Sequence, residues 1–411
     1  MRRRLPAPLL VLFAGFLVAR PAAAGSEEFS TFDVIRQEAD DESLLDHLLM
    51  RPPPAWRDEW ERSPQALRTS QGCLTSGQWS VDTQLKLRSP LGERARFGLD
   101  VRDDQSDRAS YTYFDLSFRF PTALGTPGVL FRPLYDKSRQ DFALFWETGA
   151  ETTAVQTRWT FTLEDVFNNL WAFRQSRVGE ISEPYDRHPY EPAIFLALRQ
   201  PRWRAELQGQ VLTPSRKSVI TVFGRPGVNV TLWGTYARAR LECRLLGLEW
   251  EAAGENRQAH SSEALSNATD LAGGDFRRQW SGETALRGSV RPNLEVEGRW
   301  LYQGRSQGSD TPYPTRRLDA VDRVLQLETR WSLRPHCTLR FGGLHDRITA
   351  GSIGNPYPAY GTRVESRGYF GFQARFGNAS VSAVEGIELD PERYEVWWVH
   401  DKGFLQLQTT F

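Results

Sequence analysis

Apolar and polar residues alternate along this chain from about residue 78 to its end, and a period of two predicts β-strands. In the first clear segment, the alternate residues from Trp79 to Leu87 are apolar or Thr, and those between them are polar or charged. Since successive side chains of a strand point to opposite faces, each such segment has one apolar and one polar face. The pattern predicts an all-β fold of about 16 to 18 strands.

The connections predict an antiparallel arrangement with two unlike rims. Two late hairpins turn at Arg291-Pro292-Asn293 and Arg334-Pro335-His336, and both prolines lie in the turn, where no ladder N–H is needed. Tight turns of this kind alternate with long polar connections, which we place at residues 164–191, 213–227, 254–276, 303–320 and 346–363. We therefore expect short turns on one rim and long loops on the other.

The N-terminus has the pattern of a secretory signal peptide. Arg2, Arg3 and Arg4 precede a short apolar stretch from Leu9 to Val18, and an A-x-A cleavage site ends at Ala24. We therefore expect residues 1–24 to be removed on export. No other stretch approaches the roughly 18 uncharged apolar residues of a transmembrane helix, so a membrane-embedded form of this chain requires a closed barrel.

The last strand carries the most specific signal. Leu405, Leu407, Thr409 and Phe411 share one face, and Gln406, Gln408 and Thr410 share the other. A closing strand of this kind that ends in Phe resembles the terminal signal of bacterial outer-membrane β-barrels, which the barrel-assembly machinery reads.

This resemblance implies a porin-like, closed antiparallel transmembrane β-barrel over residues 76–411. It also implies a location in the outer membrane of a Gram-negative bacterium and contact with outer-membrane lipid, with Phe411 as the assembly signal. The alternative is a secreted β-sandwich, in which the apolar faces would meet across a core.

The number of strands leaves one question open. If the tight turns face the periplasm, the strand at residues 78–88 runs toward the periplasm and lacks an opening partner. Either another strand lies upstream, around Phe29 to Arg36, or the last segment contains a hairpin at Asp401-Lys402-Gly403.

Residues 25–75 differ from the rest of the chain. An acidic turn at Asp40 precedes Leu residues at helical spacing, and Ser63-Pro64 resembles a helix N-cap followed by proline at the first helical position. We predict a short helical leader, which either occupies the lumen as a plug or packs against the periplasmic rim.

The polar faces of the strands carry charges of both signs. Cross-strand neighbours on one face lie close enough to pair. Such a lining either forms a constriction that orients charged solutes or is a solvated wall of weak ion pairs. The residues that we predict to line the lumen are Arg96, Arg102, Arg119, Arg158, Arg238, Arg240, Arg287, Arg299, Arg330, Arg340, Asp82, Asp100, Asp115, Glu242, Glu283, Glu297 and Glu328.

Composition excludes several other classes of protein. The formal net charge is zero, which argues against a nucleic-acid binder. The three Cys residues form no metal or disulfide pattern, no phosphate loop or nucleotide fingerprint is present, and we predict no cofactor. Most of the fourteen Trp fall on apolar faces, which favours an interfacial girdle over a sugar-stacking track in the lumen.

Three functions follow from these patterns. The first is a non-enzymatic channel for small polar or charged solutes of unknown identity. The second is a structural barrel that docks a partner protein, and the third is an outer-membrane hydrolase that uses His188, His260 or His345. Assembly into a homo-oligomer is left open.

Overall fold

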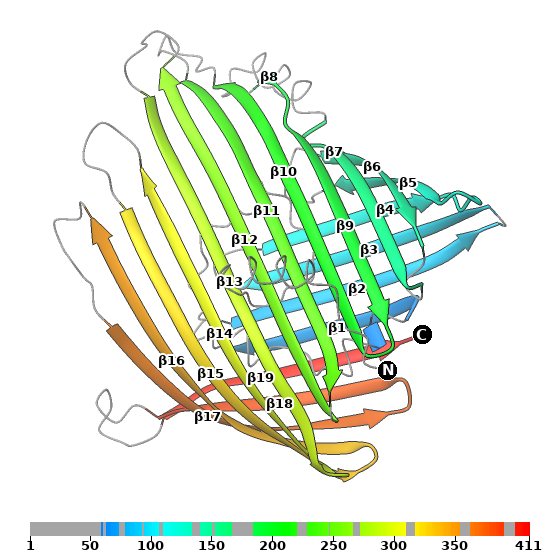
Figure 1. Ribbon diagram of the computed structural model, residues 1–411, viewed down its shortest axis with the longest axis vertical. Helices are drawn as coiled ribbons and strands as arrows, with labels where there is room; N and C mark the ends of the chain where they lie inside the picture. Colours follow the sequence, from blue (N-terminus) through cyan, green and yellow to red (C-terminus); the bar gives the residue numbers. More distant parts are fainter. Residues whose placement is uncertain are drawn as a thin grey trace, which may run out of the picture.

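The chain forms a closed antiparallel β-barrel in a computed structural model (Figure 1). The structure describes residues 59–60, 63–73, 79–92, 94–106, 110–133, 140–149, 153–166, 184–219, 228–245, 247–265, 272–309, 317–353, 362–389 and 399–411. The predicted signal peptide and most of the predicted leader lie outside these residues. Over the described part of the chain, no helix is long and apolar enough to cross a membrane.

Within the described residues, nineteen strands make up the sheet. They are β1 (Gln65–Cys73), β2 (Trp79–Leu91), β3 (Ala95–Ser106), β4 (Ser110–Arg119), β5 (Thr126–Pro133), β6 (Gln140–Thr148), β7 (Val155–Leu163), β8 (Tyr185–Arg187), β9 (Tyr190–Gln200), β10 (Trp203–Val219), β11 (Val228–Leu245), β12 (Leu248–Leu265), β13 (Ala272–Arg291), β14 (Leu294–Ser309), β15 (Arg317–Arg334), β16 (Cys337–Ile353), β17 (Thr362–Phe376), β18 (Ala379–Glu388) and β19 (Val399–Thr410).

The ring closes where the first strand meets the last. β1 pairs with β2 along its whole length and with β19 from Ala66 opposite Thr410 to Gly72 opposite Phe404. β7 pairs directly with β9, and the short β8 pairs only with β10. Eighteen of the nineteen strands therefore form the closed barrel, which confirms the predicted fold class and strand number.

β1 answers the question of the missing strand and corrects two predictions. Gln65–Cys73 is a strand, so the helix predicted to begin at Ser63-Pro64 is wrong, and the barrel already begins at Gln65 rather than at residue 76. The predicted hairpin at Asp401-Lys402-Gly403 is also wrong, because β19 runs through these residues. The alternative strand around Phe29 to Arg36 lies outside the described residues.

The two rims differ as predicted. One rim carries the short turns, such as that between β9 and β10, and Figure 1 shows the C-terminus close to this turn. The backbone N–H of Phe411 donates to the carbonyl of Gln65 at 3.1 Å, which brings the end of β19 to the start of β1 on the same rim. Since outer-membrane barrels have short periplasmic turns, we assign this rim to the periplasm.

The strands toward the other rim are longer than predicted. β12 continues to Leu265 and β13 begins at Ala272, so most of the connection predicted at residues 254–276 is strand. β13 has 20 residues, which is about twice a tilted membrane crossing of roughly 9 to 11 residues. The ends of these strands therefore project beyond the hydrocarbon layer, where alternation is not required because both faces meet water or protein.

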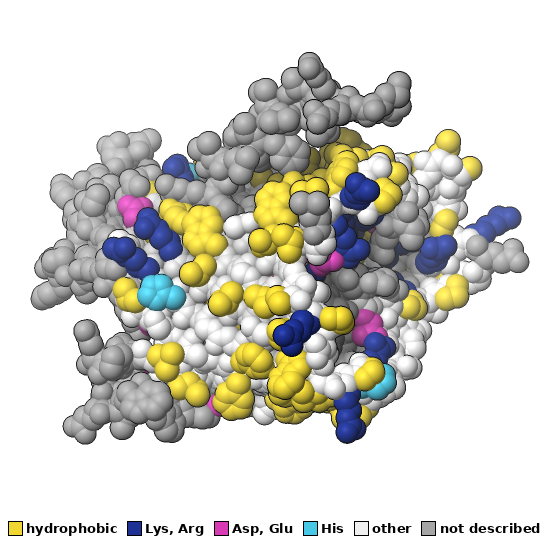
Figure 2. Space-filling view, turned by 60° about the horizontal axis from the view of Figure 1, so that its bottom comes forward, with side chains coloured by type: hydrophobic (Ala, Val, Ile, Leu, Met, Phe, Trp, Pro, Cys, Tyr) yellow, Lys and Arg dark blue, Asp and Glu magenta, His cyan; other side chains and the backbone are white. Residues whose placement is uncertain are grey.

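The barrel is apolar outside and polar inside. In β19, Leu405 and Leu407 are exposed, whereas Gln406 and Gln408 are buried. Exposed Trp, Phe and Leu side chains recur on the same face of most strands, and Figure 2 shows hydrophobic side chains spread over the surface on the short-turn side. The apolar faces do not meet across a core, so the β-sandwich alternative is wrong.

An apolar outer wall around a closed, polar interior is the arrangement that a bilayer requires of a β-structure. The protein is therefore an outer-membrane β-barrel.

Candidate channel lining

The polar faces point to the inside of the barrel and are crossed by ion pairs. The most extensive set, which we call the arginine–glutamate lattice, crosses β11 to β16 close to the short turns. Its members are Arg244, Arg287, Arg299, Arg330 and Arg340 with Glu249, Glu283, Glu295, Glu297 and Glu328.

The antiparallel register builds this lattice. Glu249 lies directly opposite Arg287, and Glu295 lies opposite Arg330, so opposite charges face each other on neighbouring strands. Arg330 bridges three carboxylates, at 2.9 Å from Glu295, 2.8 Å from Glu297 and 2.6 Å from Glu328. The planar guanidinium group suits such shared contacts. With five arginines and five glutamates, the lattice is balanced in charge.

Glu328 is an enclosed carboxylate at the β15–β16 end of the lattice, with a side chain only 2 % exposed. It accepts hydrogen bonds from Arg340 at 2.8 Å and from the hydroxyl of Tyr369 at 2.8 Å. Gln326 in turn donates to the Tyr369 hydroxyl at 2.9 Å. The charge of Glu328 is thus compensated by two arginines and oriented by a tyrosine.

Tyr369 is an inward-facing residue that sequence reasoning missed, because the predicted lining contained only charged residues. Its register partner is Gly342, where an added Cβ would lie 2.5 Å from the tyrosine ring. Gly342 therefore leaves the space that the ring fills. A glycine opposite an aromatic residue on paired strands is the signal that could have revealed this contact.

A second group of charges lies on the inner face of β4, β6 and β7. Glu147 pairs with Arg119 at 3.4 Å and with Arg158 at 3.5 Å. Both guanidinium groups also lie over the ring of Phe145, at 5.3 Å and 4.8 Å from its centroid. Two cations thus share one carboxylate and one aromatic ring.

The remaining predicted residues form smaller groups. Arg240 pairs with Glu242 and Glu251 beside the lattice. Arg102 lies 3.6 Å from Asp82, whereas the partners of Asp100 and Asp115 are Arg88 and Arg132, which were not on the predicted list. Arg238 is half-buried between Tyr236 and Arg240 on the inner face of β11, and Arg96 is exposed at the start of β3.

The segment before β1 reaches the periplasmic mouth of the barrel. The carbonyl of Trp60 accepts a hydrogen bond from Lys86 at 3.0 Å, and the guanidinium of Arg68 lies over its ring at 4.9 Å. Lys86 of β2 lies opposite Ala66 of β1, and Arg68 of β1 lies opposite the inward-facing Gln84 of β2, so both cations are on the inner face. Glu59 also pairs with Arg375 at 2.9 Å. This segment therefore contacts the inner edge of the wall.

The three histidines considered for a hydrolase lie in different surroundings. His345 is exposed and its Nδ1 lies 3.0 Å from the hydroxyl of Ser366, whereas Asp346 is buried on the opposite face of β16. His260 lies in strand β12, not in a loop, and stacks on Trp233 at 4.0 Å. His188 packs against Tyr185, whose hydroxyl donates to Asp165 at 2.7 Å. Adjacent residues of a strand cannot form a base–carboxylate pair because they face opposite ways.

Within the described ranges, no three His, Cys, Asp or Glu side chains are grouped to hold a metal ion.

Comparisons with known proteins give likeness of architecture alone. No family model matches the chain, and no curated protein matches it. Among solved structures, CdiB from Acinetobacter baumannii has a TM-score of 0.44 at 10 % identity, covering 84 % of this chain and 60 % of CdiB. OmpT, an outer membrane protein of Vibrio cholerae, has a TM-score of 0.36 at 8 % identity, covering 84 % and 96 %. The CymD monoaromatic hydrocarbon channel has a TM-score of 0.32 at 10 % identity, covering 84 % and 88 %. The chain thus spans three-fifths of the length of CdiB.

Proposed function

We propose that the protein is a channel through which small polar or charged solutes diffuse across the outer membrane. The observation that carries the proposal is the closed ring of eighteen strands with a charged and polar inner face. Barrels of about 16 to 18 strands are wide enough to enclose an aqueous channel, whereas those of about eight strands are filled by their own side chains.

The charges of the inner wall support passage of polar solutes rather than an apolar cargo. The arginine–glutamate lattice covers one part of the wall, and the group of Arg119, Arg158 and Glu147 covers another. Both signs are present in each group. Such a lining orients a dipolar or charged solute by a local field rather than selecting one sign of charge.

Conductance in planar bilayers tests this proposal. Refolded protein in its heat-modifiable, folded form should produce stable conductance steps. A matched control is the Thr69→Pro variant, which we expect not to close its barrel, carried through the same refolding procedure. Folded protein that inserts into the bilayer without conducting would remove the proposal.

The role of the lattice has a separate test. Replacing Arg330 and Arg340 by Gln removes two inward positive charges, so the reversal potential in a salt gradient should shift toward cation selectivity. Arg347 is exposed on the opposite face of β16, and the Arg347→Gln variant should leave the reversal potential unchanged. An equal shift in both variants would show that the lattice does not line the conducting path.

Two further roles belong to the same proposal. The segment that ends at Trp60 acts as a plug at the periplasmic mouth, supported by its contacts with Lys86 and Arg68. The terminal strand, with the exposed side chain of Phe411, is read by the barrel-assembly machinery. A second copy of the chain is also proposed as a partner, and chemical cross-linking in native membranes tests for the resulting oligomer.

A further inference from the structure

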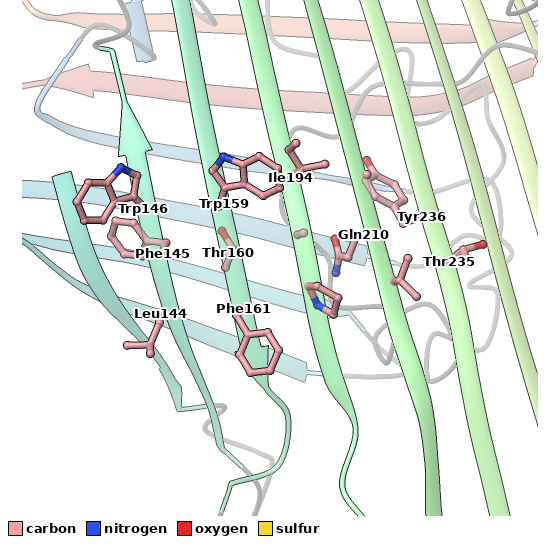
Figure 3. A pocket seen from close by; sticks show the side chains of 14 residues that line it. Leu144, Phe145, Trp146, Trp159, Thr160, Phe161, Ile194, Gln210, Thr235 and Tyr236 are labelled. Atoms are coloured by element: carbon pink, nitrogen blue, oxygen red, sulfur yellow. The ribbon is translucent and has the colours of Figure 1, made fainter. Parts of the chain in front are cut away.

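The described part of the outer wall has a hollow across β6, β7, β9, β10 and β11. The hollow has a volume of about 750 Å³ and is lined mainly by outward-facing side chains (Figure 3). We call it the wall groove. Its most exposed side chains are those of Leu144, Trp146, Trp159, Phe161, Ile194 and Val211.

Two cross-strand pairs form one side of the wall groove. Trp146 lies opposite Trp159, and Leu144 lies opposite Phe161, on β6 and β7. Figure 3 shows the two indole rings at one level of the strands and Leu144 and Phe161 at another. The indoles lie at the end nearer the short connection between β6 and β7, which is the periplasmic side.

The hollow exists because one outward position carries no side chain. Leu207, Gly209 and Val211 are successive outward residues of β10, and both neighbours of Gly209 are large and exposed. A Cβ added at Gly209 would meet only Ile194 Cγ2, at 3.6 Å. The space beside Gly209 is therefore open to a ligand rather than filled by the protein.

The chemistry of the wall groove identifies its occupant. No charged residue lines it, and the aliphatic and aromatic side chains that dominate it are continuous with the exposed apolar belt that contacts the bilayer. Its volume of about 750 Å³ lies within the range of small-molecule sites. A groove within the hydrocarbon layer is filled by hydrocarbon.

We propose that the wall groove binds one acyl chain of a phospholipid from the periplasmic leaflet. Trp146 and Trp159 lie at the periplasmic end, where amphipathic rings favour the interface between headgroups and hydrocarbon. Ile194 and Gly209 lie in the same cross-strand row as the two indoles, and the acyl chain extends from this row along the strands, past Phe161 and Leu144, toward the middle of the membrane. The bound lipid is distinct from the annular lipid that exchanges freely around the barrel. This inference does not rest on the proposed channel activity.

Retention of lipid through detergent exchange tests the proposal. The full-length mature protein is purified in a mild detergent, washed extensively, and analysed by native mass spectrometry and by phosphate content. We expect one phospholipid per barrel in the wild type. The Gly209→Phe variant fills the groove and should retain at least tenfold less lipid.

A matched control is available on the same outer face. Gly254 of β12 also has open space around an added Cβ but lies outside the groove, so the Gly254→Phe variant should retain lipid like the wild type. If Gly209→Phe does not fold, Gly209→Val takes its place, since fewer added atoms still narrow the groove. The Gly209 and Gly254 variants should all conduct like the wild type.

Three results would overturn the proposal. The first is a wild-type barrel that retains no more phospholipid than the Gly209 variant. The second is retained lipid that proves to be lipopolysaccharide. The third is an oligomer, free of phospholipid, that dissociates when Gly209 is replaced, which would make a second copy of the chain the occupant.

Discussion

At the scale of single residues, the inner wall is held by charges that cannot be removed one at a time without cost. Glu328 contacts Arg330, Arg340 and Tyr369, and it has almost no access to solvent. Removing one partner of a buried ion pair leaves an uncompensated charge, which costs more than the intact pair contributes.

The Glu328→Gln variant should therefore be less stable than the wild type by about 3 kcal/mol. The free energy of unfolding would be measured by urea titration in detergent, followed by tryptophan fluorescence. Asp100→Asn is the control, because its pair with Arg88 is partly exposed and such pairs are worth about 0–1 kcal/mol. Equal losses in the two variants would contradict the special position of Glu328.

The two adjacent glycines of β16 provide a second contrast. Gly342→Ala would press a methyl group against Tyr369 and the carbonyl of Leu327, so the folded barrel should melt at a lower temperature. Gly343→Ala should be close to neutral, because its nearest contact is the carbonyl of Arg367 at 3.6 Å. The melting temperature of each variant is measured as the midpoint of the heat-induced shift in gel mobility. A Gly343→Ala barrel that melts at or below the temperature of Gly342→Ala would contradict the prediction.

Among the elements, β1 closes the ring because it pairs with β2 on one side and with the last strand, β19, on the other. Thr69 lies opposite Leu407 of β19 and opposite Thr83 of β2, with its hydroxyl 3.0 Å from that of Thr83. Proline has no N–H and is excluded from strands that are paired on both edges.

The Thr69→Pro variant should fail to close, with loss of the heat-modifiable band and of resistance to protease. Thr69→Val keeps a β-branched side chain and loses only the contact between hydroxyl groups, so it should assemble normally. A closed and resistant Thr69→Pro barrel would show that β1 is dispensable for the ring.

The strands that sequence reasoning found, and those it missed, differ in their surroundings. In β19, one face meets lipid and the other faces inward, so apolar and polar residues alternate strictly from Leu405 to Gln408. In β1 the sequence QALRTSQGC alternates only weakly, and Ser63-Pro64 imitates a helix start, which is why it was missed. The distal half of β12 meets water or protein on both faces, so its AHSSEAL segment has the composition of a loop.

Which charged residues face inward could be predicted from the alternation along each strand, but their ion-pair partners could not. Parity needs only the period of two within one strand, whereas a partner depends on the register between strands. Asp100 and Asp115 show this limit, because they pair with Arg88 and Arg132, which the predicted set of lining residues did not include.

For the whole molecule, the proposed plug role of the segment before β1 can be tested by conductance. Removing residues 26–62 should raise single-channel conductance, because it takes away the group that contacts Lys86 and Arg68 inside the mouth. The Lys86→Met variant keeps the segment and should show more frequent transitions to a high-conductance state. Unchanged conductance in the truncated barrel would place the segment at the rim rather than in the path.

The C-terminal residue should matter for assembly rather than for stability. The side chain of Phe411 is 66 % exposed, so deleting Phe411 should leave the refolded barrel about as stable as the wild type. In cells, the same deletion should lower the amount of barrel in the outer membrane. Phe376→Ala, at an equally exposed aromatic residue of β17, is the control for simple loss of apolar surface. A similar loss in both variants would argue against a terminal signal.

The pairing of β1 with β19 requires that both ends of the polypeptide be present before the barrel can close. A polypeptide that lacks either strand keeps two sheet edges with unpaired N–H and C=O groups, which makes it susceptible to degradation. β1 therefore has one unpaired edge until β19 has been added. A chain released before it is complete therefore differs from a finished barrel in having unpaired sheet edges.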